Sequence, residues 1–145
     1  MNKTTAGQTV TALPPILVID DDPAVLSTLR DLGQSMNSLR LVLHLDPSTA
    51  AEAAADPTIG LIVCDYRFPR ASGVTFIEDL RKRGIQTPVL FISGSPDSSA
   101  VIRASQIEHT SFLGKPFSFA RFRDAIASLL GEGNGGRARP LTNAL

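Results

Sequence analysis

The sequence lacks three features that would each point to a particular class of protein. It has a single cysteine, Cys64, which cannot form an intrachain disulfide and suits a reducing compartment. It has no apolar run near the roughly 20 residues that a membrane-spanning helix needs, and the segment from Met1 to Thr11 has no secretory apolar core. These absences favour a cytoplasmic protein that neither spans a membrane nor depends on disulfides.

Excess charge and metal-binding histidine pairs are also missing. The chain has 14 basic and 14 acidic residues, so no bulk field draws it toward nucleic acid, and we expect no direct nucleic-acid binding. His44 and His109 have no second histidine or cysteine at ligand spacing, which argues against a zinc site. An apolar strand around Cys64 would hide its thiol and raise the thiol pKa, so a catalytic cysteine is not expected.

Four apolar runs each stop at a polar residue. The runs cover residues 16–19, 61–64, 89–92 and 112–114, and they are followed by Asp20-Asp21-Asp22, Asp65, Ser93 and Lys115 respectively. Such runs are typical of strands buried on both faces. In open α/β sheets, ligands bind outside the carboxyl ends of the strands. We therefore expect carboxylates, a hydroxyl and an ammonium to converge at one edge of a parallel sheet.

Helices are expected between these strands. Asp22-Pro23, Asp46-Pro47 and Ser72-Gly73 are helix-start signals, and apolar residues recur at helical spacing after the first and third of them and again over residues 119–129. Residues 41–45 alternate as a further strand, and residues 96–105 allow a short helix. Five alternations of strand and helix predict a doubly wound α/β fold, with a five-stranded, mostly parallel sheet and helices on both faces.

The two ends of the chain carry no periodic pattern. Residues 1–13 are expected to form a flexible N-terminal tail, and the glycine-rich residues 132–145 a flexible C-terminal tail or linker. The remaining residues, 14–131, then make one domain, which is long enough to bury about two thirds of its unfolded surface.

The acidic residues at the expected sheet edge create an electrostatic problem. Two carboxylates about 4 Å apart repel by roughly 4 kcal/mol at an effective dielectric constant near 20. A Mg²⁺ ion would offset the charge of Asp20, Asp21 and Asp65, since it typically takes one or two carboxylates, several waters and a phosphate oxygen. Lys115 adds a point charge suited to a phosphoryl group, and a carboxylate can act as a nucleophile toward phosphorus.

These residues follow the pattern of a known family. The landmarks are Asp20-Asp21 after the first strand, Asp65 to Pro69 with Gly73 after the third, Ser93-Gly94 after the fourth and Lys115-Pro116-Phe117 after the fifth. Over about residues 14–131 the chain resembles the receiver domain of two-component response regulators. The resemblance implies the flavodoxin-like strand order 2-1-3-4-5 and a cis peptide between Lys115 and Pro116.

The resemblance also implies the roles of the site residues. Asp65 would accept a phosphoryl group from a phosphohistidine on a histidine kinase or a histidine phosphotransfer protein. Asp20, Asp21, Asp65 and the main-chain carbonyl of Arg67 would hold Mg²⁺. Lys115 would pair first with the acceptor carboxylate and then with the phosphoryl oxygens.

Two further residues would form the switch of such a domain. Ser93 would bond to the phosphoryl group and draw its loop inward, and Phe112 would turn inward behind it. This is a two-state element biased by added charge. The chain would then act as a signalling switch rather than an enzyme, passing the signal to a downstream protein, with homodimer formation left open.

Three departures from the family pattern stand out. The usual small-residue turn before the fifth strand is replaced by Ile107, Glu108 and His109, so the family pattern does not define the end of the fourth helix. Phe112 lacks the hydroxyl of the more familiar tyrosine. Arg67 puts a long cation beside the acceptor, and we hypothesise that it alters the lifetime of the phosphoryl group.

Two other functions are weighed against the receiver. A phosphohydrolase of the haloacid dehalogenase type also uses an aspartate nucleophile, Mg²⁺, a hydroxyl and a lysine, but its nucleophile follows the first strand as Asp-x-Asp, and 145 residues leave little room for a substrate cap. A phosphorylation-independent, receiver-like interaction module is the other alternative. The intact acidic set of Asp20, Asp21 and Asp65 argues against it.

Overall fold

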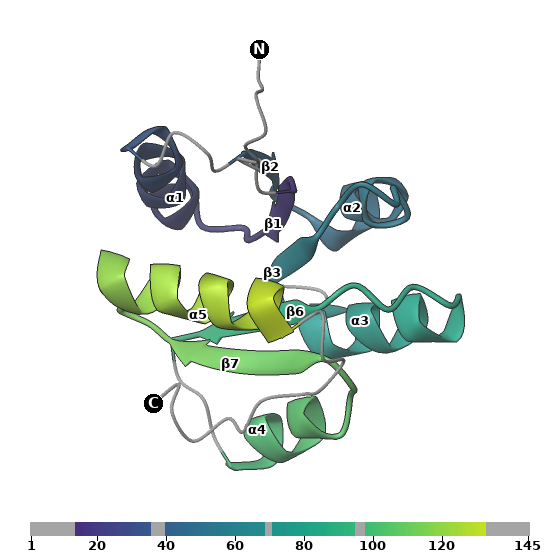
Figure 1. Ribbon diagram of the computed structural model, residues 1–145. Coiled ribbons are helices and arrows are strands. Elements are labelled where there is room, and N and C mark those ends of the chain that lie inside the picture. The colour runs from purple at the N-terminus through teal and green to yellow at the C-terminus, as the bar shows by residue number, and fades with distance from the viewer. Residues whose placement is uncertain (1–13, 36–39, 69–70, 95–97, 133–145) are drawn as a thin grey trace.

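The computed structural model describes residues 14–35, 40–68, 71–94 and 98–132 (Figure 1). The expected tail at residues 1–13 lies outside these ranges, as do nearly all of the one expected at 132–145 and Pro69 of the motif that begins at Asp65. Glu132 is the last described residue and still belongs to a helix. Among the described residues, no helix has both the length and the apolar character needed to cross a bilayer.

Five parallel strands form the central sheet. They are β1 (Ile16–Ile19), β2 (Leu41–His44), β3 (Leu61–Asp65), β6 (Val89–Ser93) and β7 (Thr110–Gly114). Their spatial order is β2-β1-β3-β6-β7, which is the predicted order 2-1-3-4-5 when only the strands of this sheet are counted. The predicted doubly wound fold is confirmed.

Burial explains why the inner strands are so apolar. Every residue of β1 and β6 is buried, as are the first four of β3, whereas the edge strand β2 is only partly covered. Side chains of one strand alternate between two cores, so Leu17 and Ile19 of β1 lie in one and Ile16 and Val18 in the other.

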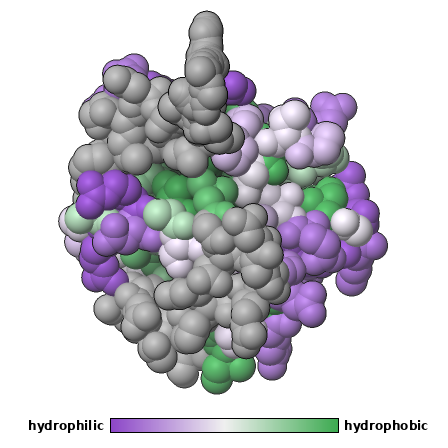
Figure 2. Space-filling view, in the orientation of Figure 1, coloured by the Kyte–Doolittle hydropathy of each residue, from purple (hydrophilic) through white to green (hydrophobic). Residues whose placement is uncertain are grey.

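Helices cover both faces of the sheet (Figure 1). They are α1 (Pro23–Ser35), α2 (Pro47–Ala54), α3 (Gly73–Lys82), α4 (Ser98–Ser105) and α5 (Phe119–Glu132). The apolar residues of α1 and α5 share one core, and those of α2, α3 and α4 share the other. Figure 2 shows a mostly hydrophilic surface along the edge where α2 and α3 lie, in keeping with helices that bury only one side.

The expected helix starts at residues 46 and 72 are confirmed in atomic detail. Asp46 accepts a hydrogen bond from the Ser48 N–H at 2.8 Å, and Ser72 Oγ accepts one from the Val74 N–H at 3.1 Å. Both side chains satisfy donors that the first turn of a helix leaves free. Hydrogen bonds to these two side chains therefore determine where α2 and α3 begin.

The turn before β7 contains Ile107, Glu108 and His109, at which the sequence departs from the family pattern. The fourth helix, α4, ends at Ser105, and His109 adopts a left-handed conformation with φ of 60°. The buried hydroxyl of Thr110 donates to the carbonyls of Ala104 and Ile107, both at 2.9 Å. These bonds close a turn that the sequence pattern did not identify.

A small hairpin follows the third strand and was not predicted. Its strands β4 (Arg67–Phe68) and β5 (Ala71–Ser72) pair antiparallel, with Arg67 opposite Ser72 and Phe68 opposite Ala71. Strands of two residues are too short to give a periodic pattern. The hairpin carries the chain from the end of β3 directly to the start of α3.

Candidate functional site

The polar residues that end the strands lie at one edge of the sheet. Asp20 follows β1, Asp65 ends β3, Ser93 ends β6 and Lys115 follows β7. The parallel register fixes their relative heights, and the Lys115 N–H donates to the Ser93 carbonyl at 2.8 Å. The convergence expected from the strand ends is therefore present.

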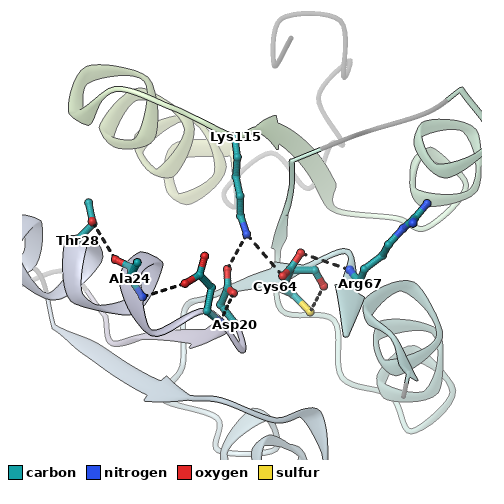
Figure 3. A network of polar contacts seen from close by, with 8 residues as sticks. Asp20, Ala24, Thr28, Cys64, Arg67 and Lys115 are labelled. Atoms are coloured by element: carbon teal, nitrogen blue, oxygen red, sulfur yellow. Dashed lines mark hydrogen bonds and ion pairs between the residues drawn. The ribbon is translucent and has the colours of Figure 1, made fainter. Parts of the chain in front are cut away.

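An ion-pair network joins three of these residues (Figure 3). Lys115 Nζ lies 3.2 Å from Asp20 Oδ2 and 3.6 Å from Asp65 Oδ2. Only 2% of the Asp20 side chain, 12% of the Asp65 side chain and 21% of the Lys115 side chain are exposed. Water therefore screens these charges much less than it would at the surface.

The three consecutive aspartates after β1 have three different environments. Asp20 is buried, and its Oδ1 accepts a hydrogen bond from the Asp22 N–H at 2.9 Å. Asp22 Oδ1 accepts one from the Ala24 N–H at 2.9 Å, which makes it the cap of α1, as predicted. Asp21 is exposed to solvent. The turn thus directs one carboxylate into the site and leaves a second at its rim.

The acidic residues fit a divalent cation. Carboxylate oxygens of Asp20, Asp21 and Asp65 all lie within 4.8 Å of one another. Asp20 Oδ2 is buried without a hydrogen bond from any described residue, so its ion pair with Lys115 is the contact that offsets its charge. Hard carboxylate oxygens at this spacing are the donors that Mg²⁺ prefers. The Arg67 N–H donates to Asp65 Oδ1 at 3.3 Å, which keeps the Arg67 peptide beside Asp65.

The pKa values of Asp65 and Lys115 are both raised. Burial, together with the charges of Asp20 and Asp21, raises the pKa of Asp65 from 3.8 to about 6, although Lys115 and the Arg67 N–H work in the opposite direction. Burial by itself would lower the pKa of Lys115, but the charges of Asp20 and Asp65 outweigh it and the pKa is raised. Burial is thus the main cause of the raised pKa of Asp65, whereas the neighbouring carboxylates are the cause of the raised pKa of Lys115.

The expected switch residues lie on neighbouring strands. Ser93 is buried at the end of β6, and Phe112 is fully buried in β7. The Phe112 ring centroid lies 6.4 Å from that of Phe91 and 6.2 Å from that of Tyr66. The Lys115–Pro116 peptide is cis, as the resemblance implied.

Sequence reasoning missed one residue of the site. Tyr66 directly follows Asp65, its ring packs on Phe112, and its carbonyl accepts a hydrogen bond from the Gly73 N–H at 2.7 Å. Its position next to Asp65 was a signal that could have drawn attention to it. The burial of the Cys64 thiol was expected, and burial with the nearby charges of Asp65 and Asp20 raises the pKa of that thiol.

Known proteins share this sequence pattern and this fold. The sequence matches the family of response regulator receiver domains over residues 16–127. The chain belongs to the response regulator receiver family. The predicted family is thereby confirmed, and receiver domains are signalling switches.

Curated relatives of this receiver domain are longer proteins. "Transcriptional regulatory protein FixJ" of Azorhizobium caulinodans is 32% identical over 118 residues, which is 81% of this chain and 56% of the relative. "Response regulator protein TodT" of Pseudomonas putida is 30% identical over 115 residues, which is 79% of this chain and 50% of the relative. The chain spans about half the length of these two proteins.

Solved structures support the fold of this receiver domain. The signal receiver domain of an HD domain-containing protein from Pseudomonas fluorescens Pf-5 matches with a TM-score of 0.76 and 22% identity, over 88% of this chain and 94% of that one. The receiver domain of the Francisella response regulator 1452 matches with a TM-score of 0.73 and 24% identity, over 83% of this chain and 98% of that one.

Proposed function

We propose that this receiver domain carries a phosphoryl group on Asp65, taken from a phosphohistidine on a histidine kinase or a histidine phosphotransfer protein. The main support is the position of Lys115 Nζ, 3.2 Å from Asp20 Oδ2 and 3.6 Å from Asp65 Oδ2. One ammonium bridges the acceptor and its neighbour, and a phosphoryl group on Asp65 would offer the same ammonium new oxygens to pair with.

The transfer step uses the Asp65 carboxylate as a nucleophile. A carboxylate oxygen attacks phosphorus, the P–N bond to the donor imidazole breaks and a P–O bond forms, while the imidazole, protonated on its other nitrogen, leaves in its neutral form. Asp65 must be ionised for this attack. A pKa of about 6 leaves it ionised above neutral pH and more basic than an ordinary aspartate.

The other residues of the site hold the charges in place. Asp20, Asp21, Asp65 and the Arg67 carbonyl would hold Mg²⁺, which when bound would offset the negative charge of the carboxylates and the phosphoryl oxygens. The Ser93 hydroxyl, on the strand beside β3, would donate to a phosphoryl oxygen.

The phosphoryl group would act on the surface of the domain through a switch. Movement of Ser93 toward the phosphoryl group would shift the loop after β6, and Phe112 on the adjacent strand would adjust behind it. The altered surface would contact a downstream protein. Attack of water on the phosphoaspartate would reset the domain.

A labelling experiment tests the proposal. The protein is incubated with Mg²⁺ and ³²P-labelled acetyl phosphate, and an acid-stable, base-labile label is expected in the wild type and in Asp124→Asn, an exposed control on α5. The label should be absent from Asp65→Asn and from samples with excess EDTA. A wild type without label would contradict phosphoryl transfer and favour the phosphorylation-independent module. Steady turnover of p-nitrophenyl phosphate would instead favour the phosphohydrolase.

A further inference from the structure

We infer that Gly73 is a positioning residue for the acceptor, because the start of α3 packs on the Asp65 peptide so closely that only a residue without a side chain leaves the carboxylate in place. The inference rests on the proposed function, since it concerns the placement of the group that would be phosphorylated. It assigns a role in the site to a residue that bears no reactive group.

The close contact involves atoms that cannot easily move. A Cβ atom added to Gly73 would overlap the carbonyl oxygen of Asp65, and it would lie 3.1 Å from the carbonyl carbon of Asp65 and 3.1 Å from Cys64 Sγ. Cys64 and Gly73 are buried, and the Asp65 oxygen belongs to the backbone of a central strand. A methyl group at residue 73 would therefore displace either α3 or the acceptor peptide.

Space, and not backbone conformation, explains the glycine. Gly84 has a positive φ of 84°, whereas Gly73 is not in the left-handed region. Helix propensity gives no reason for glycine at residue 73, because alanine is the better helix former, by roughly 1 kcal/mol in a helix interior. A loss of function on replacement by alanine would thus run against local helix propensity.

The acceptor loop is also tied to this point of α3. The Gly73 N–H donates to the Tyr66 carbonyl at 2.7 Å. Arg67 pairs with Ser72 across the β4–β5 hairpin, and the Arg67 N–H reaches Asp65 Oδ1 at 3.3 Å. A shift at residue 73 would therefore move both the acceptor carboxylate and the Arg67 carbonyl that is expected to bind Mg²⁺.

The test compares Gly73→Ala with the wild type through the only tyrosine of the chain. The sequence has one tyrosine and no tryptophan, so tyrosine emission reports on Tyr66, beside the acceptor. In the absence of Mg²⁺, we expect the tyrosine emission of Gly73→Ala to differ from that of the wild type. In a Mg²⁺ titration followed by this emission, Gly73→Ala should bind Mg²⁺ at least tenfold more weakly than the wild type. Phosphorylation by acetyl phosphate should slow by about 10- to 100-fold, as for a reacting group misplaced by about 1 Å.

Gly60→Ala is the matched control. Its added Cβ would overlap the side chain of Pro14, at the opposite end of β3 from Asp65. This variant should lose stability, but its tyrosine emission should be unchanged and its Mg²⁺ affinity should stay within about twofold of the wild type. All measurements are made at 10 °C in trimethylamine N-oxide, which favours the folded state, and affinities are expressed per folded molecule.

Each outcome has a distinct meaning. A wild type that binds no Mg²⁺ overturns the proposed function, whatever Gly73→Ala does. A wild type that binds Mg²⁺ together with a Gly73→Ala variant of equal affinity overturns the positioning role alone. The same holds if Gly60→Ala loses as much affinity as Gly73→Ala, or if Gly73→Ala does not fold in the osmolyte, because the methyl group would then act on the fold as a whole.

Discussion

Two ion-pair clusters connect neighbouring elements of this domain, and they differ in burial. Lys115 holds Asp20 and Asp65 at 3.2 and 3.6 Å at the largely buried sheet edge. Arg103 of α4 holds Glu78 of α3 at 3.0 Å, with 45% and 38% of the two side chains exposed. The shorter contact is the one in water, where ion pairs contribute little to stability. Distance alone therefore does not identify the cluster that matters.

The balance of charge separates the clusters further. The Arg103 guanidinium meets one carboxylate and the Thr75 hydroxyl, and its hydrogen bond to Glu78 raises the pKa of Arg103. At the sheet edge one ammonium faces several carboxylates, and burial together with the charge of Asp20 raises the pKa of Asp65 to about 6. The exposed cluster is already neutral, whereas the buried one has an electrostatic cost that a cation can relieve.

Removal of the lysine should have the largest effect on stability. Lys115→Met leaves Asp20 and Asp65 without their counter-ion. We expect the free energy of unfolding to fall by about 2 to 3 kcal/mol in EDTA at pH 7.5. This loss is smaller than that for a fully buried ion pair because Lys115 is partly exposed. Urea denaturation measures this. Mg²⁺ should restore part of the loss.

The control for this variant is Lys82→Met, which removes an exposed lysine of α3. Its stability should change by no more than about 0.5 kcal/mol. Equal losses in the two variants would contradict the comparison, since burial would then make no difference to the value of a lysine.

Replacement of Asp65 should stabilise the protein in a pH-dependent way. Burial and Asp20 raise the pKa of Asp65 from 3.8 to about 6, so the folded state holds this proton more tightly than the unfolded chain does. The cost of ionising Asp65 is absent below about pH 3.8 and complete above about pH 6. Asp65→Asn should therefore gain about 1 to 2 kcal/mol at pH 7.5 in EDTA, and the gain should fall to about 0.3 kcal/mol at pH 4.

Urea denaturation at several pH values between 4 and 7.5 measures this gain. Asp124→Asn, on the exposed side of α5, serves as the control and should show no such gain. A gain for Asp65→Asn that is the same at pH 4 and at pH 7.5 would mean that it comes from packing and not from relief of charge.

The sequence predicted the features that depend on neighbouring residues in the chain better than those that depend on contacts between distant segments. Apolar runs that end on polar residues and the cap signals of Asp46 and Ser72 are local patterns, and the strands and helix starts they predicted are present. The strand order came from family resemblance, because periodicity does not specify which strands pair. Two-residue strands β4 and β5 gave no pattern at all.

The site shows the same limit. The sequence predicted that Asp20, Asp65 and Lys115 would meet, but it could not distinguish buried Asp20 from exposed Asp21, which are neighbours in the chain. Burial depends on contacts made by distant segments. For the same reason neither the pKa of about 6 for Asp65 nor the overlap that excludes a side chain at Gly73 follows from any local motif.

Arg67 is an exposed cation next to the buried ion-pair cluster of Lys115, Asp20 and Asp65. Its N–H contacts Asp65 Oδ1 at 3.3 Å, while its side chain extends away from Lys115 in Figure 3. If the side chain turned toward a phosphoryl group on Asp65, its charge would hinder attack by water, so Arg67→Ala should then shorten the phosphoryl lifetime by about two- to fivefold, or less than about 1 kcal/mol. Loss of the ³²P label after removal of acetyl phosphate measures this, and Arg67→Lys should keep most of the lifetime. An unchanged rate in Arg67→Ala would refute the hypothesis.

The exposed cluster should give the smallest effect. A double-mutant cycle with Arg103→Gln and Glu78→Gln should give a coupling energy of about 0.5 kcal/mol, falling as salt is raised from 0.05 to 0.5 M, because both side chains are well exposed. The Arg123–Asp124 contact, 3.8 Å long and confined to α5, provides a control cycle with a coupling near zero. A coupling energy between Arg103 and Glu78 as large as the loss in Lys115→Met would contradict the comparison. The exposed ion pair between α3 and α4 would then contribute as much to stability as the buried cluster at the sheet edge.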